Sequence, residues 1–140
     1  MRVFFDNCTS PVLADVLNSF IQADGGAARH IRAMADYGFR HDTPDIEWIE
    51  RLNHDRPTDW VVITSDAQIR RNKANRTAWL RAGLKGFVLA AGFQKTPMNQ
   101  VASTLLWWWP EMETFIRSAA PRSLFELPVK RSSGFKALTV

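Results

Sequence analysis

Residues 60–66 read WVVITSD, and this stretch decides how the rest of the chain is interpreted. Its first four residues are apolar and three of them are β-branched, which is typical of a strand buried on both faces. Polar residues follow at once and end in Asp66. Near the start of the chain, RVFFDNC at residues 2–8 has the same order, because apolar residues lead directly into Asp6. Since a charge is costly to bury, such an aspartate is either a turn or cap residue or a metal ligand.

Strands and helices are expected to alternate along the chain. Strands are expected at residues 3–5, 27–31, 60–63, 86–89 and 123–127, and helices at residues 11–23, from 44 through Leu52, at 75–82 and from 97 to before Pro121. Ser10-Pro11 and Thr43-Pro44 each place a capping side chain before a proline at the first helical position. This alternation, together with continuously apolar strands, predicts an α/β fold: three α/β/α layers around a central parallel sheet of four to five strands.

Length and composition fit one soluble domain. The chain has 140 residues, of which 46% are apolar and 23% charged, so a single core is expected over residues 1–128, followed by a loose basic tail over residues 129–140. No apolar run approaches the ~18 residues that span a bilayer, and no leader segment is evident. The single cysteine excludes an internal disulfide. We therefore expect a cytoplasmic protein with no membrane association.

Charge is divided unevenly between the two halves of the chain. Residues 1–66 carry a net charge of −5, whereas residues 67–140 carry +9, and no acidic residue lies between Asp66 and Glu111. The basic residues that follow Asp66 most closely are Arg70, Arg71, Lys73 and Arg76. This asymmetry indicates an anionic partner, most simply a nucleic acid, although a basic surface exposed only to solvent is an alternative.

Asp6 and Asp66 are expected to converge. In open parallel sheets ligands gather beyond the carboxyl ends of the strands, and neighbouring strands lie ~4.8 Å apart. Asp45, at the start of a helix, is a candidate third carboxylate, with Glu47 in reserve. Clustered carboxylates need a counterion, and their oxygens suit Mg²⁺ or Mn²⁺. Such a centre beside a basic surface describes a metal-dependent nuclease.

The segments VFFDNC, TPDIEWI and VVITSDAQI resemble the PIN domain, in its compact, toxin-type ribonuclease branch. That family combines an aspartate after the first strand, an acid on a helix and a T-x-D aspartate after a central strand. Asp6, Asp45 and Asp66 match these positions as catalytic and metal-binding residues, with Thr64 at the threonine. The resemblance implies an Mg²⁺- or Mn²⁺-dependent endoribonuclease that cleaves RNA, often the toxin of a type II toxin–antitoxin pair with an antitoxin protein as partner.

Two alternatives remain open. Relatives often carry another acid two residues after the T-x-D aspartate, where this chain has Gln68, so a PIN-like scaffold that binds RNA or a protein without cutting is the second hypothesis. A receiver-like domain would share the strand-end aspartates. It would require a lysine after a later strand, and Lys95 follows Leu89 only loosely.

The remaining candidates concern substrate and partner contacts. Asn7, Thr64, Ser65 and the basic residues after Asp66 are expected to contact the substrate, although Asn7 and Ser65 are also common turn residues. Residues 107–109 are three consecutive tryptophans, which point about 100° apart on a helix and cannot form one stacking platform. They are expected to pack in the core and against a partner, so a homodimer is a further expectation.

Overall fold

The computed structural model describes residues 1–55 and 59–140. Its elements, in chain order, are β1 (Arg2–Phe5), α1 (Pro11–Ile21), η1 (Gln22–Asp24), β2 (Ala27–His30), η2 (Ile31–Ala33), η3 (Ala35–Tyr37), α2 (Asp45–Asn53), β3 (Trp60–Thr64), α3 (Gln68–Arg71), α4 (Lys73–Ala82), β4 (Lys85–Leu89), η4 (Ala91–Lys95), α5 (Met98–Ser118), β5 (Leu124–Leu127) and β6 (Lys136–Leu138). The expected alternation of strands and helices is confirmed.

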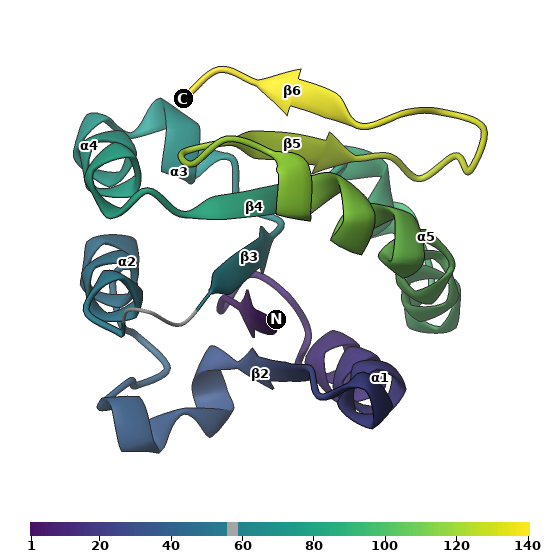
Figure 1. Ribbon diagram of the computed structural model, residues 1–140, viewed down its shortest axis with the longest axis horizontal. Coiled ribbons are helices and arrows are strands. Elements are labelled where there is room, and N and C mark those ends of the chain that lie inside the picture. Colours follow the sequence, from purple (N-terminus) through teal and green to yellow (C-terminus); the bar gives the residue numbers. More distant parts are fainter. Residues whose placement is uncertain (56–58) are drawn as a thin grey trace.

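One six-stranded sheet forms the middle of the molecule, in the order β2-β1-β3-β4-β5-β6 (Figure 1). β2, β1, β3, β4 and β5 are parallel, as expected, and β6 is antiparallel to β5. β1 and β3 are direct neighbours, with Phe5 paired to Ile63. The residues that follow these two strands therefore emerge side by side at the same edge of the sheet.

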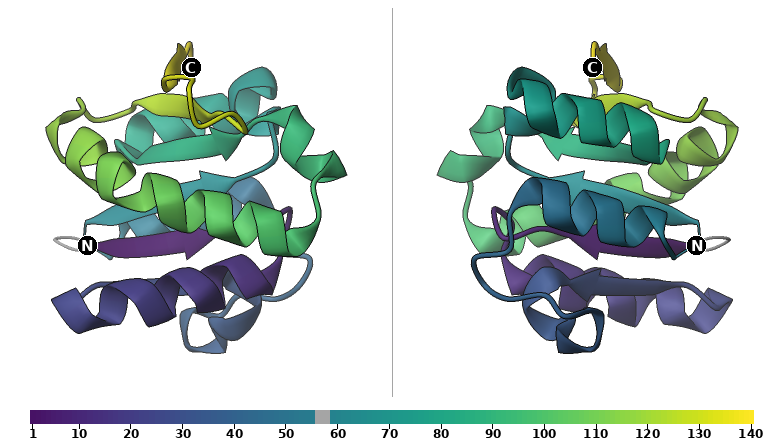
Figure 2. Two further views of the ribbon diagram at one scale, coloured as in Figure 1. Left: turned by 90° about the vertical axis from the view of Figure 1, so that its right-hand side faces the viewer. Right: turned by 90° about the vertical axis from the view of Figure 1, so that its left-hand side faces the viewer.

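Helices cover both faces of the sheet. α1 and α5 lie on one face, whereas α2 and α4 lie on the other (Figure 2). Alternate strand residues divide between two cores: Phe5 and Ile63 pack with α1 and α5, whereas Phe4 and Val62 pack with α2 and α4. Two buried faces explain why the strands are continuously apolar. Among the described residues, no helix has the length and apolarity needed to cross a bilayer.

The tryptophan triplet on α5 contributes mainly to the core. Trp108 and Trp109 are 2% and 3% exposed, whereas Trp107 is 47% exposed. The interpretation that these rings do not form one platform is therefore correct. Trp107 instead lies beneath the guanidinium of Arg131, which is 5.1 Å from its ring centroid.

The two expected helix starts differ. Ser10 caps α1, because its Oγ accepts a hydrogen bond from the Val12 amide at 3.2 Å. The prediction that Thr43 caps α2 is wrong: Pro44 occupies the cap position and Asp45 is the first helical residue. The Thr43 hydroxyl accepts instead from the backbone amide of Arg40 at 2.7 Å. The hydroxyl of Thr43 thus belongs to the turn before the helix, and the first bonds of α2, from the Glu47 and Trp48 amides, go to the Pro44 carbonyl.

Residues 129–140 are more ordered than a loose tail. β6 pairs with β5, and the loop before it carries Phe135 onto the rings of Phe87 and Trp108, with centroids 5.3 and 5.0 Å apart. Antiparallel pairing and aromatic burial were not evident from the sequence because the strand has only three residues. The segment therefore closes one edge of the sheet.

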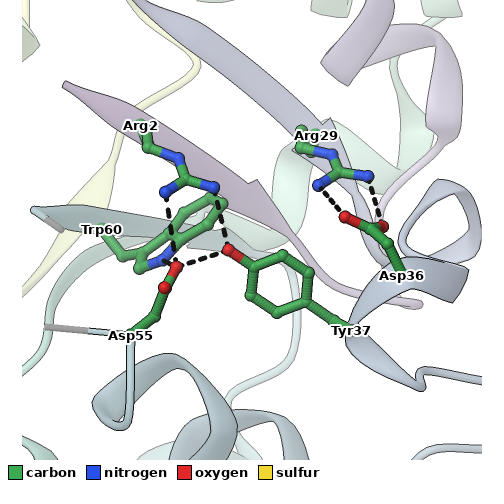
Figure 3. Close-up of polar contacts among 6 residues, drawn as sticks. All are labelled: Arg2, Arg29, Asp36, Tyr37, Asp55 and Trp60. Atoms are coloured by element: carbon green, nitrogen blue, oxygen red, sulfur yellow. Dashed lines mark hydrogen bonds and ion pairs between the residues drawn. The ribbon is translucent and has the colours of Figure 1, made fainter.

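A polar cluster fastens the opposite, amino-terminal ends of β1 and β3 (Figure 3). Asp55 accepts hydrogen bonds from Arg2 at 3.4 Å, from the Trp60 indole at 3.0 Å and from the Tyr37 hydroxyl. These contacts lower the pKa of Asp55, and the hydrogen bond from Tyr37 has the largest effect. The Arg2 guanidinium also lies 4.3 Å from the Trp60 ring centroid. The cluster ties η3 and the end of α2 to the sheet, far from the edge where Asp6 and Asp66 lie.

Candidate functional site

Asp6 and Asp66 lie next to each other beyond the carboxyl ends of β1 and β3, and Thr64 joins them. The Thr64 hydroxyl donates to Asp6 Oδ2 at 2.5 Å, and the Thr64 hydroxyl oxygen accepts from the backbone amide of Asp66 at 3.0 Å. Asp6 is 1% exposed and Thr64 is fully buried. The convergence of these two acids follows from the parallel pairing of their strands.

Burial and like charges act together on Asp6. Its pKa is raised from 3.8 to about 7, first by burial and then by the carboxylates of Asp45 and Asp66. Hydrogen bonds from Thr64 and from the Cys8 amide, at 3.2 Å to Oδ1, oppose this rise. The mutual electrostatic effect means that the three carboxylates share one small region, which we call the acidic centre.

Asp45 enters the acidic centre from the first turn of α2. The Trp48 indole donates to its Oδ1 at 3.0 Å, and the Asn75 amide on α4 donates to its Oδ2 at 3.1 Å. Burial first, and then Asp66, raises the pKa of Asp45. Trp48 and Asn75 thus hold both oxygens of this carboxylate, a role that the sequence alone did not indicate.

The two loops that carry Asp6 and Asp66 are bonded to each other. The Ser65 hydroxyl donates to the Cys8 carbonyl at 2.6 Å, and the Cys8 sulfur lies 3.8 Å from Asp66 Oδ2. Partial burial, followed by the three nearby carboxylates, raises the pKa of the Cys8 thiol to about 12. Cys8 therefore remains a neutral thiol at the edge of the acidic centre. The backbone N–H of Gln68 donates to Asp66 Oδ1 at 2.9 Å.

Buried His30 and half-buried Asn7 support the loop after β1. His30 Nε2 is 2.8 Å from the Thr9 carbonyl, and its Nδ1 accepts from the Arg32 amide at 3.1 Å. Burial lowers the pKa of His30, which fits a neutral ring that donates from Nε2. The Asn7 side chain donates to the His41 carbonyl at 2.7 Å and accepts from the Arg32 guanidinium at 3.3 Å. In this structure the Asn7 side chain connects the loop after β1 to His41 and to Arg32.

The donor set of the acidic centre fits a hard divalent cation, but not a preformed three-ligand cage. None of the ion pairs within residues 1–55 and 59–140 involves Asp6, Asp45 or Asp66, so their charge has no basic partner there. In that same part of the chain, no group of three or more His, Cys, Asp or Glu side chains is arranged to hold a metal ion. Mg²⁺ usually binds through one or two carboxylates and keeps several waters, so the neighbouring Asp6 and Asp66 suffice.

Two of the four candidate basic residues border the acidic centre. Arg70 and Arg71 line a hollow of about 360 Å³ together with Asp66, which we call the arginine hollow. The Arg70 Nε donates to the Thr139 carbonyl at 3.1 Å, so the end of the chain lies along this hollow. Lys73 instead lines a separate groove between α2 and α4. Arg76 is a half-buried residue of α4.

Two further acids, Glu126 and Glu47, lie in different surroundings: one lines the arginine hollow and the other is on the surface. Glu126 lies within β5, one residue before its end, and lines the arginine hollow; a rule that looks for an acid directly after a strand does not indicate it. Glu47, the reserve candidate, is exposed, and its carboxylate lies 3.8 Å from the Arg40 guanidinium. Glu126 is therefore the acid that sequence reasoning missed, and Glu47 takes part in a surface ion pair.

Comparison with known proteins gives one finding. A family model described as a PIN-like domain matches residues 1–91, about two thirds of the chain. The matched segment includes β1 to β4 and all three residues of the acidic centre. No curated protein and no solved structure gives a significant match to the chain.

Proposed function

Because the chain belongs to the PIN-like domain family, we propose that it is a metal-dependent endoribonuclease that hydrolyses RNA phosphodiesters. PIN-like domains are generally nucleases and typically use divalent metal ions. The observation that carries the proposal is the pairing of Asp6 with Asp66 at the ends of adjacent strands, joined through the Thr64 hydroxyl. An uncompensated carboxylate pair at this edge of a parallel sheet is suited to a cation-dependent reaction.

Asp6 and Asp66 are the residues that would hold Mg²⁺ or Mn²⁺, with Asp45 facing them from α2. The bound ion would stabilise charge on the phosphate and lower the pKa of water. Thr64 fixes one oxygen of Asp6, and Trp48 fixes one oxygen of Asp45. These contacts hold the carboxylates in place before a cation binds, so less side-chain freedom is lost on binding.

Arg70 and Arg71 are the residues that would hold the phosphates flanking the cleaved bond. Both line the hollow that Asp66 borders, and both follow Asp66 within five positions. Phosphate contacts by arginine position a nucleic acid without reading its sequence. The proposal therefore assigns hydrolysis of the phosphodiester to the acidic centre and binding of the flanking phosphates to the arginine hollow.

The test is cleavage of fluorescent single-stranded RNA in Mn²⁺ by the Asp6→Asn and Asp66→Asn variants. Each is expected to lose activity by at least ~100-fold, since each would remove a charged ligand, while the circular dichroism spectrum stays unchanged. Asp15→Asn is the matched control, because Asp15 is an exposed acid on α1. Full activity in both centre variants would refute the assignment.

A scaffold that binds without cutting is the second candidate. It is favoured by Gln68 two residues after Asp66 and by the absence, among the described residues, of a three-ligand group. Calorimetric titration with Mn²⁺ separates the two functions. No heat of binding at millimolar metal supports the scaffold, whereas binding that Asp66→Asn removes supports the nuclease.

The proposal extends to a role as the toxin of a type II toxin–antitoxin pair, with an antitoxin protein and a second copy of the chain as proposed partners. It rests on the resemblance of the three motifs alone. Exposed Trp107 on α5 offers an aromatic surface to a protein partner. A neighbouring gene for a small DNA-binding protein whose co-expression relieves growth arrest would support this role, and growth unaffected by the chain alone would oppose it.

A further inference from the structure

An apolar pocket lies beside the acidic centre, on the other side of Ser65 from the arginine hollow. It has a volume of about 200 Å³, many times the ~10–15 Å³ that a single water requires. Its apolar wall consists of Leu13, Leu89, Phe93, Met98 and Val101. None of the described residues that line it carries a charge. Six polar residues, among them Ser65, Gln94 and Thr96, complete the lining, but none supplies a positive charge, so the apolar pocket suits an uncharged group with polar edges better than it suits a phosphate.

The apolar pocket and the arginine hollow adjoin. Ser65, Leu89 and Gln94 line both, and the apolar pocket also includes Cys8, two residues after Asp6. Charge divides the two: the arginine hollow is lined by two cations, Arg70 and Arg71, and by two acids, Asp66 and Glu126, whereas only uncharged side chains line the apolar pocket. A nucleic-acid strand carries the same division, because its phosphates are anionic and its bases are flat with apolar faces.

We propose that the apolar pocket binds one unpaired nucleobase of the RNA strand whose backbone crosses the acidic centre and the arginine hollow. This inference rests on the proposed function, because it takes RNA as the substrate. Met98 forms part of the wall and is 40% exposed, so its side chain is available to contact the base. Gln94 is exposed beside it and offers an amide to the polar edge of the base.

The pocket also determines which form of RNA is selected. A base within a duplex is stacked and paired, so it would have to leave the helix to enter the pocket. A base in a loop, bulge or single strand is already free to do so. The protein is therefore expected to prefer single-stranded or looped RNA over a duplex of the same sequence.

The experiment is a binding titration by fluorescence anisotropy, in EDTA so that no cleavage occurs. The probes are short single-stranded RNA oligonucleotides in which one abasic position is moved along the strand. For the wild-type chain, one position is expected to weaken binding by about 5- to 150-fold, and its neighbours by much less. Met98→Ala is expected to weaken binding of intact RNA but not of the RNA abasic at that position.

Phe20→Ala is the matched control, since Phe20 is an apolar residue, 49% exposed, that lines a different pocket between α1 and α5. Phe20→Ala should leave the affinity for intact RNA and the affinity for the abasic RNA unchanged. Equal affinity for every abasic probe, or an equal loss in Met98→Ala on intact and abasic RNA, would overturn the inference. Loss of a dimer in Met98→Ala with unchanged RNA affinity would assign the pocket to an interface between copies instead. Position-dependent binding without any cleavage by the wild type would refute only the nuclease activity.

Discussion

Replacing Asp6 by asparagine should make the protein more stable while removing its proposed activity. Asp6 is buried, and its pKa is raised from 3.8 to about 7. Because the pKa is higher in the folded chain than in the unfolded one, Asp6 contributes stability in acid, and this contribution is lost as the pH rises from about 4 to about 7. An asparagine at this position stays uncharged, so the stability of the variant does not fall in this way as the pH rises.

The size of the effect follows from the two pKa values. One pKa unit of difference corresponds to about 1.4 kcal/mol, so the advantage of Asp6→Asn should be about 2 kcal/mol at pH 5 and about 4 kcal/mol at pH 8. The pH 8 value corresponds to a rise in melting temperature of roughly 10 °C for a chain of this size. Hydrogen bonds to the side chain are retained in part, since Asn Oδ1 still accepts from the Cys8 amide.

Urea unfolding of the two proteins at pH 5 and pH 8, in EDTA, measures this difference. Mn²⁺ added at pH 8 should stabilise the wild type and narrow the gap, because a bound cation offsets the buried charge. Asp15→Asn, at an exposed site, should show no pH-dependent gain. An Asp6→Asn variant that is no more stable than the wild type at pH 8 would show that burial and the neighbouring acids do not destabilise the Asp6 carboxylate, and the reasoning would fail.

Three other outcomes are expected. Asn75→Ala frees one oxygen of Asp45 and should weaken Mn²⁺ binding by about 10-fold in calorimetry, whereas unchanged affinity would remove this amide from the centre. Arg71→Ala should lower the slope of log affinity against log salt for RNA by about 1 unit; an unchanged slope would mean that this side chain meets no phosphate. Trp108→Ala should cost about 3–5 kcal/mol of unfolding free energy, against less than ~1 kcal/mol for exposed Trp107→Ala, and equal losses would contradict the core described above.

The meeting of Asp6 and Asp66 could be predicted because two properties of the sequence determine it. Continuously apolar strands indicate a parallel sheet with both faces covered, and in such a sheet the carboxyl ends of the strands share one edge. Thr64 follows from the same argument, since it ends β3 beside Asp66. Local patterns and a topological rule were sufficient here.

The surroundings of Asp45 could not be predicted in this way. Asn75 reaches it from α4, thirty positions along the chain, and only the packing of α2 on α4 brings them together. The cap predicted for α2 was wrong because the Thr43 hydroxyl accepts from the Arg40 amide, a contact that the pattern Thr-Pro does not reveal. β6 is too short to show an alternating pattern.

The position of α5 has a practical consequence for anyone designing a fragment. The family match ends at residue 91, within η4, and so leaves out α5, β5 and β6. Yet Leu105, Met112 and Leu127 are among the most deeply covered side chains of the core that α1 shares. A chain truncated at residue 91 would expose both this apolar face and the unpaired edge of β4, and it is therefore expected to aggregate. The unit recognised by evolutionary comparison is thus smaller than the unit that folds.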